Sequence, residues 1–322
     1  MDLNNKLLIG DVRQLVKEIP DKTVQCIVTS PPYWGLRDYD KDEQIGQELH
    51  PEDFVNALVS LSDDLYRILK DDGTYWLNLG DTYFGPKGGH WESENSITND
   101  ATGTKYREAR KAPPKHRYLK TKDLVGIPWK CAFGLQQAGW YLRNDVIWSK
   151  NNPMPEAVKD RFAKSHEHIF LLSKKKHYYF DYEAVLEPYT TPLNRWGGER
   201  FNDVEDTKYV DGMDKKLGYS HQGKDGKGKL SRPNPNGRTR RDVWHINTSS
   251  FKGAHFAVFP EEIPQYAIQA GSKKGDLVMD PFMGSGTTAV VATRLGRKWL
   301  GCELNEEYAK IIKERTNQVE LF

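Results

Sequence analysis

The stretch "DLVMDPFMGSGTTAVVATRLGRKWLGCELN", Asp276 to Asn305, decides the fold class of this chain. Its apolar run over 276–279 predicts a buried strand, and a glycine-rich turn follows that run. The next residues predict a helix over 287–295 and a second strand over 299–302. A strand, a turn, a helix and a strand in this order are typical of an α/β sheet.

The turn in this stretch carries the features of a ligand site. Glycines at 284 and 286 let the backbone turn tightly and approach a ligand closely, and the N-terminus of the following helix faces the same place. Glu303 ends the second strand, where a carboxylate can accept hydrogen bonds from both hydroxyls of a ribose. The alternative is a tight strand-to-helix turn that binds nothing. The arrangement favours an adenosine-containing cofactor.

Two common nucleotide motifs are absent from this turn. It lacks the third glycine of the dinucleotide fingerprint, and it lacks the Gly-Lys-Ser/Thr of a phosphate-binding loop. NAD and ATP are therefore disfavoured, and S-adenosylmethionine remains a good candidate.

Strands and helices alternate along most of the chain. The sequence predicts strands over 7–9, 24–29, 74–79, 140–148 and 168–173, and helices over 12–19, 51–69, 121–138, 261–270 and 306–317. We expect Asp71-Asp72-Gly73 to stop the second helix and Pro128 to disturb the third. The predicted fold is an open, mostly parallel twisted sheet with helices on both faces.

Two polar, irregular stretches interrupt this pattern. Residues 82–120 are predicted to be a loop insertion, and 190–241 a separate target-recognition region, within a core of 1–189 and 242–322. Lys215 to Arg241 is strongly basic, which fits either a solvated loop or a segment that follows a phosphate backbone. The candidate nucleic-acid contacts are Lys224, Lys227, Lys229, Arg232, Arg238, Arg240 and Arg241.

Composition excludes several classes of protein. A hydrophobic content of 37% and a mean hydropathy of −0.75 describe a polar chain, and no apolar run approaches a membrane span. We expect no secretion signal, because the first residues lack a basic region before an apolar core, and the three cysteines form no CxxC pair. We expect a cytoplasmic protein without a metal site or a disulfide framework.

A second motif lies near the N-terminus, in "IVTSPPYWG", Ile27 to Gly35. A strand here runs directly into two prolines, which have no N–H to donate and which hold the preceding residue extended. The fold gains little from this arrangement. A reactive site can gain a rigid carbonyl that points outward.

Together, "TSPPYW" and "DPFMGSGTT" resemble the amino-methylating DNA methyltransferases, which act on adenine N6 or cytosine N4. The proline motif comes first and the glycine motif near the C-terminus, which resembles the permuted β group of that family. The first motif residue, Ser30, is similar to the cytosine-N4 enzymes, because adenine-N6 members more often carry Asp or Asn there. The resemblance extends from Gly10 to about Asn317, apart from the two irregular stretches.

The resemblance gives the proline motif a catalytic role. The lone pair of an aromatic amino nitrogen is delocalised into the ring, so two acceptors on its N–H groups can free it for attack. The Ser30 hydroxyl and the Pro31 carbonyl are the expected acceptors, and Pro32 would fix the carbonyl. Tyr33 would stack on a base flipped out of the duplex, unless it only covers the sheet edge with Trp34.

The resemblance also gives the cofactor residues. These are Asp11, His255, Phe256, Phe259, Asp280, Pro281, Phe282, Gly284, Ser285, Gly286, Thr287, Thr288 and Glu303. Asp11 can equally cap the helix that follows it, and Phe282 can be plain core packing. His166 and His168 share one strand face, but the sequence places no further metal ligands near them.

The leading hypothesis is a site-specific cytosine-N4 methyltransferase that uses S-adenosylmethionine and acts on duplex DNA. Adenine-N6 methylation by the same machinery is the closest alternative. RNA or protein amide methylation and a non-catalytic DNA-binding shell are more distant ones. Carbon-5 methylation is disfavoured because no cysteine follows a proline as that nucleophile would. The resemblance also admits a homodimer and a cognate restriction endonuclease as partners.

Overall fold

A computed structural model describes residues 2–35, 44–85, 98–99, 105–106, 115–188, 236–248 and 259–320. The chain divides into two compact units. One unit combines residues 1–181 with 241–322 and holds the sheet; the other is the segment 182–240.

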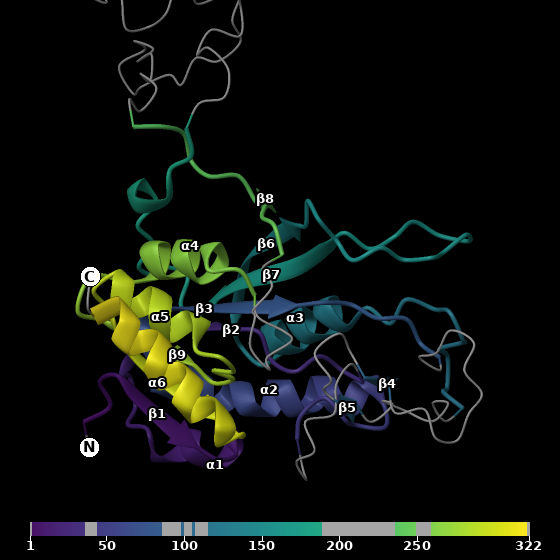
Figure 1. The fold of residues 1–322 in the computed structure, drawn as a ribbon, viewed down its shortest axis with the longest axis horizontal. Coiled ribbons are helices and arrows are strands. Elements are labelled where there is room, and N and C mark those ends of the chain that lie inside the picture. Colours follow the sequence, from purple (N-terminus) through teal and green to yellow (C-terminus); the bar gives the residue numbers. More distant parts are fainter. Residues whose placement is uncertain are drawn as a thin grey trace, which may run out of the picture. The chain divides into compact units, whose positions relative to one another are not determined.

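An eight-stranded sheet forms the centre of the larger unit (Figure 1). Its strand order is β1 (Lys6–Ile9), β10 (Lys298–Glu303), β9 (Leu277–Asp280), β2 (Val24–Thr29), β3 (Leu69–Leu79), β7 (His166–Ser173), β6 (Tyr141–Ser149) and β8 (Val243–His245). Every neighbouring pair is parallel except the two that involve β7, which runs antiparallel to β3 and to β6. The predicted open, mostly parallel sheet is confirmed.

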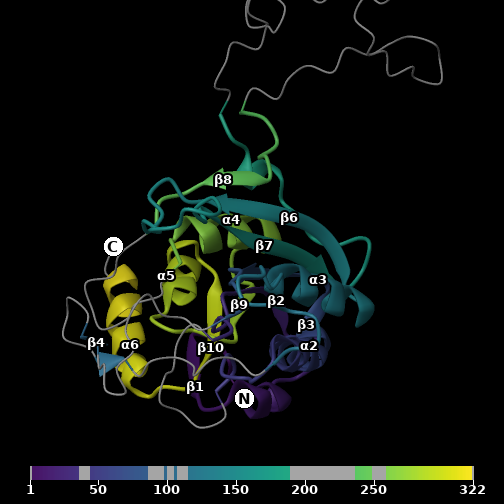
Figure 2. The ribbon, with the colours of Figure 1, turned by 90° about the vertical axis from the view of Figure 1, so that its right-hand side faces the viewer.

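Helices cover both faces of this sheet (Figure 2). One face carries α4 (Glu262–Gly271) and α5 (Thr287–Arg294), with α6 (Glu307–Glu320) packed on α5. The other carries α1 (Val12–Leu15), which continues as a 3₁₀ turn over Val16–Glu18, together with α2 (Pro51–Ile68) and α3 (Ile127–Gln137). Short elements complete the chain: β4 (Thr98–Asn99) pairs with β5 (Lys105–Tyr106), and a 3₁₀ turn spans Glu183–Val185.

No helix in the described ranges is both long enough and apolar enough to cross a membrane.

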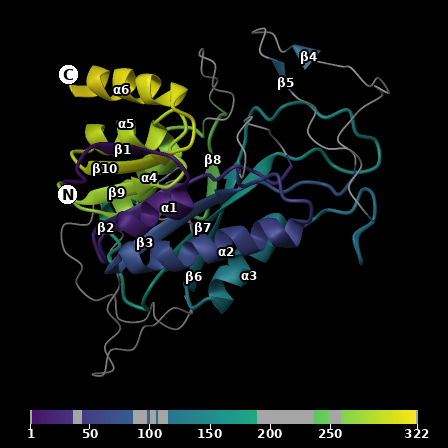
Figure 3. The same cartoon turned by 90° about the horizontal axis from the view of Figure 1, so that it is seen from below.

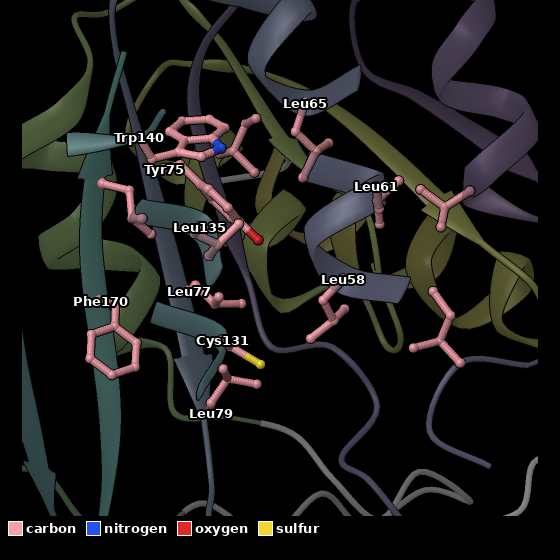
Figure 4. Close-up of a cluster of buried hydrophobic side chains, with 14 of the residues drawn as sticks. Leu58, Leu61, Leu65, Tyr75, Leu77, Leu79, Cys131, Leu135, Trp140 and Phe170 are labelled. Carbon is pink, nitrogen blue, oxygen red and sulfur yellow. The ribbon is translucent and has the colours of Figure 1, made fainter. Parts of the chain in front are cut away.

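The core between α2, α3 and the sheet fixes the position of β3. Helices α2 and α3 lie side by side on this face (Figure 3). Between them and β3 lies a cluster of buried side chains from α2, β3 and α3 (Figure 4): Leu58, Leu61, Leu65, Tyr75, Leu77, Leu79, Cys131 and Leu135. Burying each large apolar side chain contributes about 1.5–3 kcal/mol. The carboxyl end of β3 is therefore held rigidly.

Helix α3 begins later than the sequence predicts. It starts at Ile127 rather than near Thr121, so Pro128 lies in the first turn, where its missing N–H costs nothing. The N–H groups of Gly126 and Ile127 donate to the carboxylate of Asp81, which comes from the loop after β3. A cap from a distant part of the sequence leaves no local start signal, which explains the error.

Strand β3 also begins earlier than predicted, at Leu69, and includes the Asp71-Asp72-Gly73 turn signal. Its register against β2 jumps between the pairs Val24–Leu69 and Cys26–Thr74, so the extra residues form a bulge. Strand β8 has no predicted counterpart, because three residues beside a basic, irregular stretch show no period.

Candidate functional site

The motif residues meet at one edge of the sheet. Parallel strands bring their carboxyl ends to the same edge, and here β1, β10, β9, β2 and β3 are parallel. Because β7 runs antiparallel to β3, its first residues lie at that edge too, where His168 pairs with Leu79. Seven segments far apart in the sequence, including the end of β6, therefore contribute side chains to one region.

A hydrogen bond joins the proline motif to the glycine motif. Thr29 is the last residue of β2, and Asp280 is the last residue of β9. The Thr29 hydroxyl donates to Oδ1 of Asp280 at 2.6 Å. Ser30 follows the first of these residues directly, and Pro281 the second. The two motifs, about 250 positions apart in the sequence, are thus adjacent in the fold.

Asp280 is fully buried and bonded on both oxygens. Its Oδ1 also accepts the backbone N–H of Phe282 at 3.0 Å, and its Oδ2 accepts the Thr288 hydroxyl at 2.7 Å. Burial raises the pKa of Asp280 to about 6, although these three hydrogen bonds oppose the shift. The geometry favours a role in holding the turn over direct contact with a ligand.

We expect Asp280→Asn to change how stability depends on pH. The carboxyl has a pKa of about 6 in the folded state and about 3.9 in the unfolded chain. The folded state therefore binds more protons between these values, so the free energy of unfolding should fall as pH rises from about 4 to about 6, by about 3 kcal/mol. Asn does not titrate, so the difference in the free energy of unfolding between wild type and variant should change by this amount over the same pH range.

Urea unfolding at several pH values from 4 to 7 measures this difference. Asp63→Asn, on the exposed side of α2, is the control for the loss of one carboxylate. A difference between wild type and Asp280→Asn that stays constant with pH would contradict the assignment.

The glycine turn wraps around Glu303 at the end of β10. Gly284 and Gly286 have φ angles of 54° and 84°, in the left-handed region that favours glycine. The backbone N–H of Gly284 donates to Oε2 of Glu303 at 2.7 Å, and that of Asn305 donates to Oε1 at 2.9 Å. Burial raises the pKa of Glu303, and the backbone hydrogen bonds oppose this. Each carboxylate oxygen keeps a further lone pair, which suits the two hydroxyls of a ribose.

Helix α6 supplies a clamp on this turn that sequence reasoning missed. Arg315 donates through one guanidinium nitrogen to the Ser285 carbonyl at 2.8 Å, to the Ser285 hydroxyl at 2.9 Å and to the Thr287 hydroxyl at 3.3 Å. Ser285, Thr287 and Thr288 are all buried. No motif signalled Arg315, because its partners are about thirty positions away and partly backbone.

The remaining predicted cofactor residues divide into three groups. Asp11 caps α1 through its side chain, which is the alternative role that the sequence allowed for it. Asp11 also lies close to Glu303, because the N–H of the preceding residue, Gly10, donates to the Glu303 carbonyl. Phe282 is partly buried against the core and Pro281 is buried, while Phe259 is partly exposed. His255 and Phe256 lie outside the described residues.

The proline motif belongs to a hydrogen-bonded cluster. The Ser30 hydroxyl donates to Tyr33 Oη at 3.2 Å, and the Tyr33 hydroxyl donates to Glu167 Oε2, in β7, at 2.6 Å. Asn78, near the end of β3, lies with Nδ2 2.8 Å from Tyr33 Oη, 3.0 Å from Glu167 Oε2 and 3.3 Å from Ser30 Oγ. Lys150, after β6, forms an ion pair with Glu167 Oε1. Sequence reasoning missed Asn78, Glu167 and Lys150.

A cavity of about 570 Å³ adjoins this cluster. Tyr33, Gly80, Lys150 and Glu167 are on its wall, together with cationic side chains that include Lys164. The Tyr33 ring packs closely on Gly80, where an added Cβ would approach the ring to 2.8 Å. Glycine at position 80 therefore makes room for the ring beside the cavity.

The predicted DNA-contact residues are only partly within the described ranges. Lys224, Lys227, Lys229 and Arg232 lie outside them. Arg238 forms an ion pair with Glu187 at 2.7 Å, and Arg240 donates to the Val185 carbonyl at 3.0 Å, both inside the 182–240 unit. Arg241 is exposed and belongs to the larger unit. A DNA-contact role for this set stays a prediction.

The two histidines of β7 lie on one face of the strand, as their spacing predicts, and their rings meet edge to face with centroids 5.4 Å apart. His168 also contacts Asp145 of β6 through Nδ1, at 2.9 Å. Among the residues that the structure describes, no cluster of three or more His, Cys, Asp or Glu side chains could hold a metal ion.

Comparison of the sequence with known proteins gives a consistent result. A family model described as DNA methylase, of the N6/N4 type, matches residues 24–314. The Type II methyltransferase M.SmaI of Serratia marcescens is 44% identical over 310 residues, which cover 96% of this chain and 90% of the relative. M.Cfr9I of Citrobacter freundii, also a Type II methyltransferase, is 42% identical over 316 residues, which cover 98% and 89%.

Solved structures share the fold at low sequence identity. The cytosine-N4-specific PvuII DNA methyltransferase superposes with a TM-score of 0.62 at 17% identity, covering 98% of this chain and 90% of that one. TTHA0409 of Thermus thermophilus, a putative DNA modification methylase complexed with S-adenosyl-L-methionine, gives 0.55 at 21% identity, covering 98% and 94%. At these identities the likeness shows the fold alone.

Proposed function

This chain belongs to the N6/N4 family of DNA methylases, and from that premise we propose that it transfers a methyl group from S-adenosylmethionine to cytosine N4 in duplex DNA. The observation that carries the proposal is the hydrogen bond between Thr29 and Asp280, since it places the proline motif beside the glycine turn. Adenine N6 is the alternative target. Serine at position 30 favours cytosine.

The residues at the glycine turn fit S-adenosylmethionine by their donor and acceptor chemistry. Glu303 would accept the ribose hydroxyls, and Phe282, partly buried beside the turn, offers an apolar surface to the adenine. When bound, this cofactor supplies a methyl group on a positively charged sulfur. Asp280, Thr288 and Arg315 would hold the turn in shape and need not touch the cofactor.

The proline motif would activate and orient the amino group. Ser30 Oγ and the Pro31 carbonyl would each accept one of its N–H groups, which leaves the nitrogen lone pair free to point at the methyl group. Fixed acceptors aimed at the place where charge develops lower a barrier without any reorganisation at the moment of reaction. No covalent intermediate with the enzyme is needed.

The target base must leave the duplex to reach Ser30. The cavity beside Tyr33 has a volume of about 570 Å³, within the usual range for small ligands, about 300–1,000 Å³. We propose that the flipped nucleotide passes through this cavity with its base against Tyr33, so that the amino group reaches Ser30, which contacts Tyr33 beyond the cavity wall. Its cationic side chains, such as Lys164, suit a phosphate.

We further propose that residues 190–241 carry target recognition, with their basic side chains on phosphates and base edges. The Type II names of the relatives support a cognate restriction endonuclease as a functional partner. A homodimer is an additional proposal, which analytical ultracentrifugation tests directly.

Mass spectrometry of nucleosides tests the proposed reaction. Unmethylated duplex DNA is incubated with the protein and S-adenosylmethionine carrying a labelled methyl group, then digested to nucleosides. We expect labelled N4-methylcytosine. Label only in N6-methyladenine would replace cytosine by adenine as the target, and label in RNA or protein but not in DNA would overturn the proposed function.

A further inference from the structure

We propose that Ser30, Tyr33 and Glu167 form a proton relay that fixes the serine hydroxyl as an acceptor and carries away the proton lost by the target amino group. The proposal rests on the proposed amino-group methylation and holds for cytosine or adenine alike. It assigns to Glu167 and to the Tyr33 hydroxyl a role that the motif resemblance does not supply.

The donor-to-acceptor direction of the hydrogen bonds from Ser30 through Tyr33 to Glu167 follows from the chemistry of the Glu167 carboxylate. An ionised carboxylate cannot donate a hydrogen bond, so across the 2.6 Å contact the Tyr33 hydroxyl must donate to Glu167 Oε2. With its hydrogen committed, Tyr33 Oη can only accept, and across 3.2 Å it accepts the hydrogen of Ser30. The Ser30 hydrogen therefore points away from the target, and Ser30 Oγ presents lone pairs to it.

Asn78 reinforces this direction. Its Nδ2 lies within hydrogen-bond distance of all three oxygens of the chain, at 2.8 to 3.3 Å, and its two hydrogens can serve only two of them at once. The opposite amide orientation would set Oδ1 against Glu167 Oε2 and cause repulsion. Asn78 is buried at 2% exposure, so its donors keep the Tyr33 and Glu167 oxygens in place as acceptors.

Glu167 is placed to receive a proton and release it. Its side chain is 12% exposed, and its second oxygen, Oε1, pairs with Lys150, which leaves Oε2 for Tyr33. Glu167 lines the cavity of about 570 Å³, so water there can take the proton onward. Ser30 itself does not line that cavity, which gives Tyr33 the position of a bridge between them.

The transfer balances in atoms and electrons. The amino nitrogen lone pair forms the bond to carbon as the carbon–sulfur bond breaks, and that bond's electron pair leaves with sulfur. As the nitrogen–carbon bond forms, one N–H proton passes to Ser30 Oγ, the original Ser30 hydrogen passes to Tyr33 Oη, and the Tyr33 hydrogen passes to Glu167. Both hydroxyls are restored. Glu167 becomes a neutral carboxylic acid, which then loses its proton to water.

Two isosteric variants test the relay. Tyr33→Phe keeps the ring and removes the hydroxyl, and Glu167→Gln keeps the side-chain shape and removes the proton acceptor. We expect each variant to slow single-turnover methyl transfer by about a hundredfold, which is the lower end of the usual contribution of general base catalysis. The dissociation constants for DNA and cofactor should not change. The wild-type rate should fall in D₂O, and both variants should lose this solvent isotope effect.

Asp145→Asn is the matched control. It removes a carboxylate from the same β6–β7 hairpin. Asp145 contacts His168. The side chain of His168 lies on the face of β7 opposite to Glu167, because the two residues are adjacent in the strand. This variant should keep both the rate and the isotope effect. Thermal unfolding of all the variants confirms that each is folded, and either relay variant alone is sufficient for the test.

The outcomes separate the relay from the proposed function. Wild-type rates in Tyr33→Phe or Glu167→Gln would overturn the relay while DNA methylation by the wild type stands. Slow transfer that retains the wild-type isotope effect would show a structural role only, and would overturn it too. If the wild-type protein transfers no methyl group to DNA, the proposed function falls, and the relay falls with it.

Discussion

The Ser30→Ala variant should bind S-adenosylmethionine as the wild type does and yet lose methyl transfer by about a hundred- to a thousandfold, the usual cost of removing one aimed hydrogen-bonding group. The alanine side chain cannot accept an N–H of the target amino group, so the nitrogen lone pair stays delocalised. The hydroxyl lies in the cluster of Tyr33 and Asn78, apart from the Glu303 and Gly284 contacts that form the cofactor site.

Single-turnover transfer to duplex DNA and calorimetric cofactor binding measure the two halves of this prediction. Ser60→Ala, on the exposed side of α2, is a control for the loss of one hydroxyl. Full activity in Ser30→Ala would remove the proline motif from the mechanism. A parallel loss of cofactor affinity would show that the two motifs do not act on separate ligands.

The Gly286→Val variant should lose cofactor affinity by about a hundredfold, because the valine both strains the turn and displaces it. Gly286 has a φ of 84°, and a Cβ there would lie 3.0 to 3.3 Å from three atoms of Ile312 in α6. A β-branched residue in the left-handed region costs about 1–3 kcal/mol, and the contact with α6 pushes the turn out of place. The Gly284 N–H would then lose its alignment with Glu303.

Gly275→Val is the matched control for backbone strain. Gly275 has nearly the same φ, 85°, precedes β9 at its amino end, and has nothing within 4 Å of an added Cβ. Both variants should lose stability in urea, because both put valine in the left-handed region. Only Gly286→Val should lose cofactor affinity in calorimetry, and equal losses in the two variants would contradict the role of the turn.

Much of the fold was predictable because its signals are local. The apolar run of β2 at Val24–Thr29 was predicted without error, and the helical spacing of α2 gave its bounds to within one residue. The glycine turn before α5 and the carboxylate at the end of β10 were likewise readable, since each depends on its own residues. The start of α3 was not predictable in this way, because Asp81, whose carboxylate caps the helix, lies in the loop after β3.

The sequence by itself determined the two motifs, their order and the parallel α/β sheet, since strand periodicity, turn residues and spacing are properties of short segments. Only the tertiary structure decided that Glu167 and Asn78 stand beside Ser30 and Tyr33, and that Arg315 holds the glycine turn. For Glu167 the physical reason is that β7 enters the sheet antiparallel, so the start of that strand meets the carboxyl end of β3. Arg315 reaches the turn because α6 packs on α5. Which strands become neighbours depends on packing across the whole chain, which no single segment records.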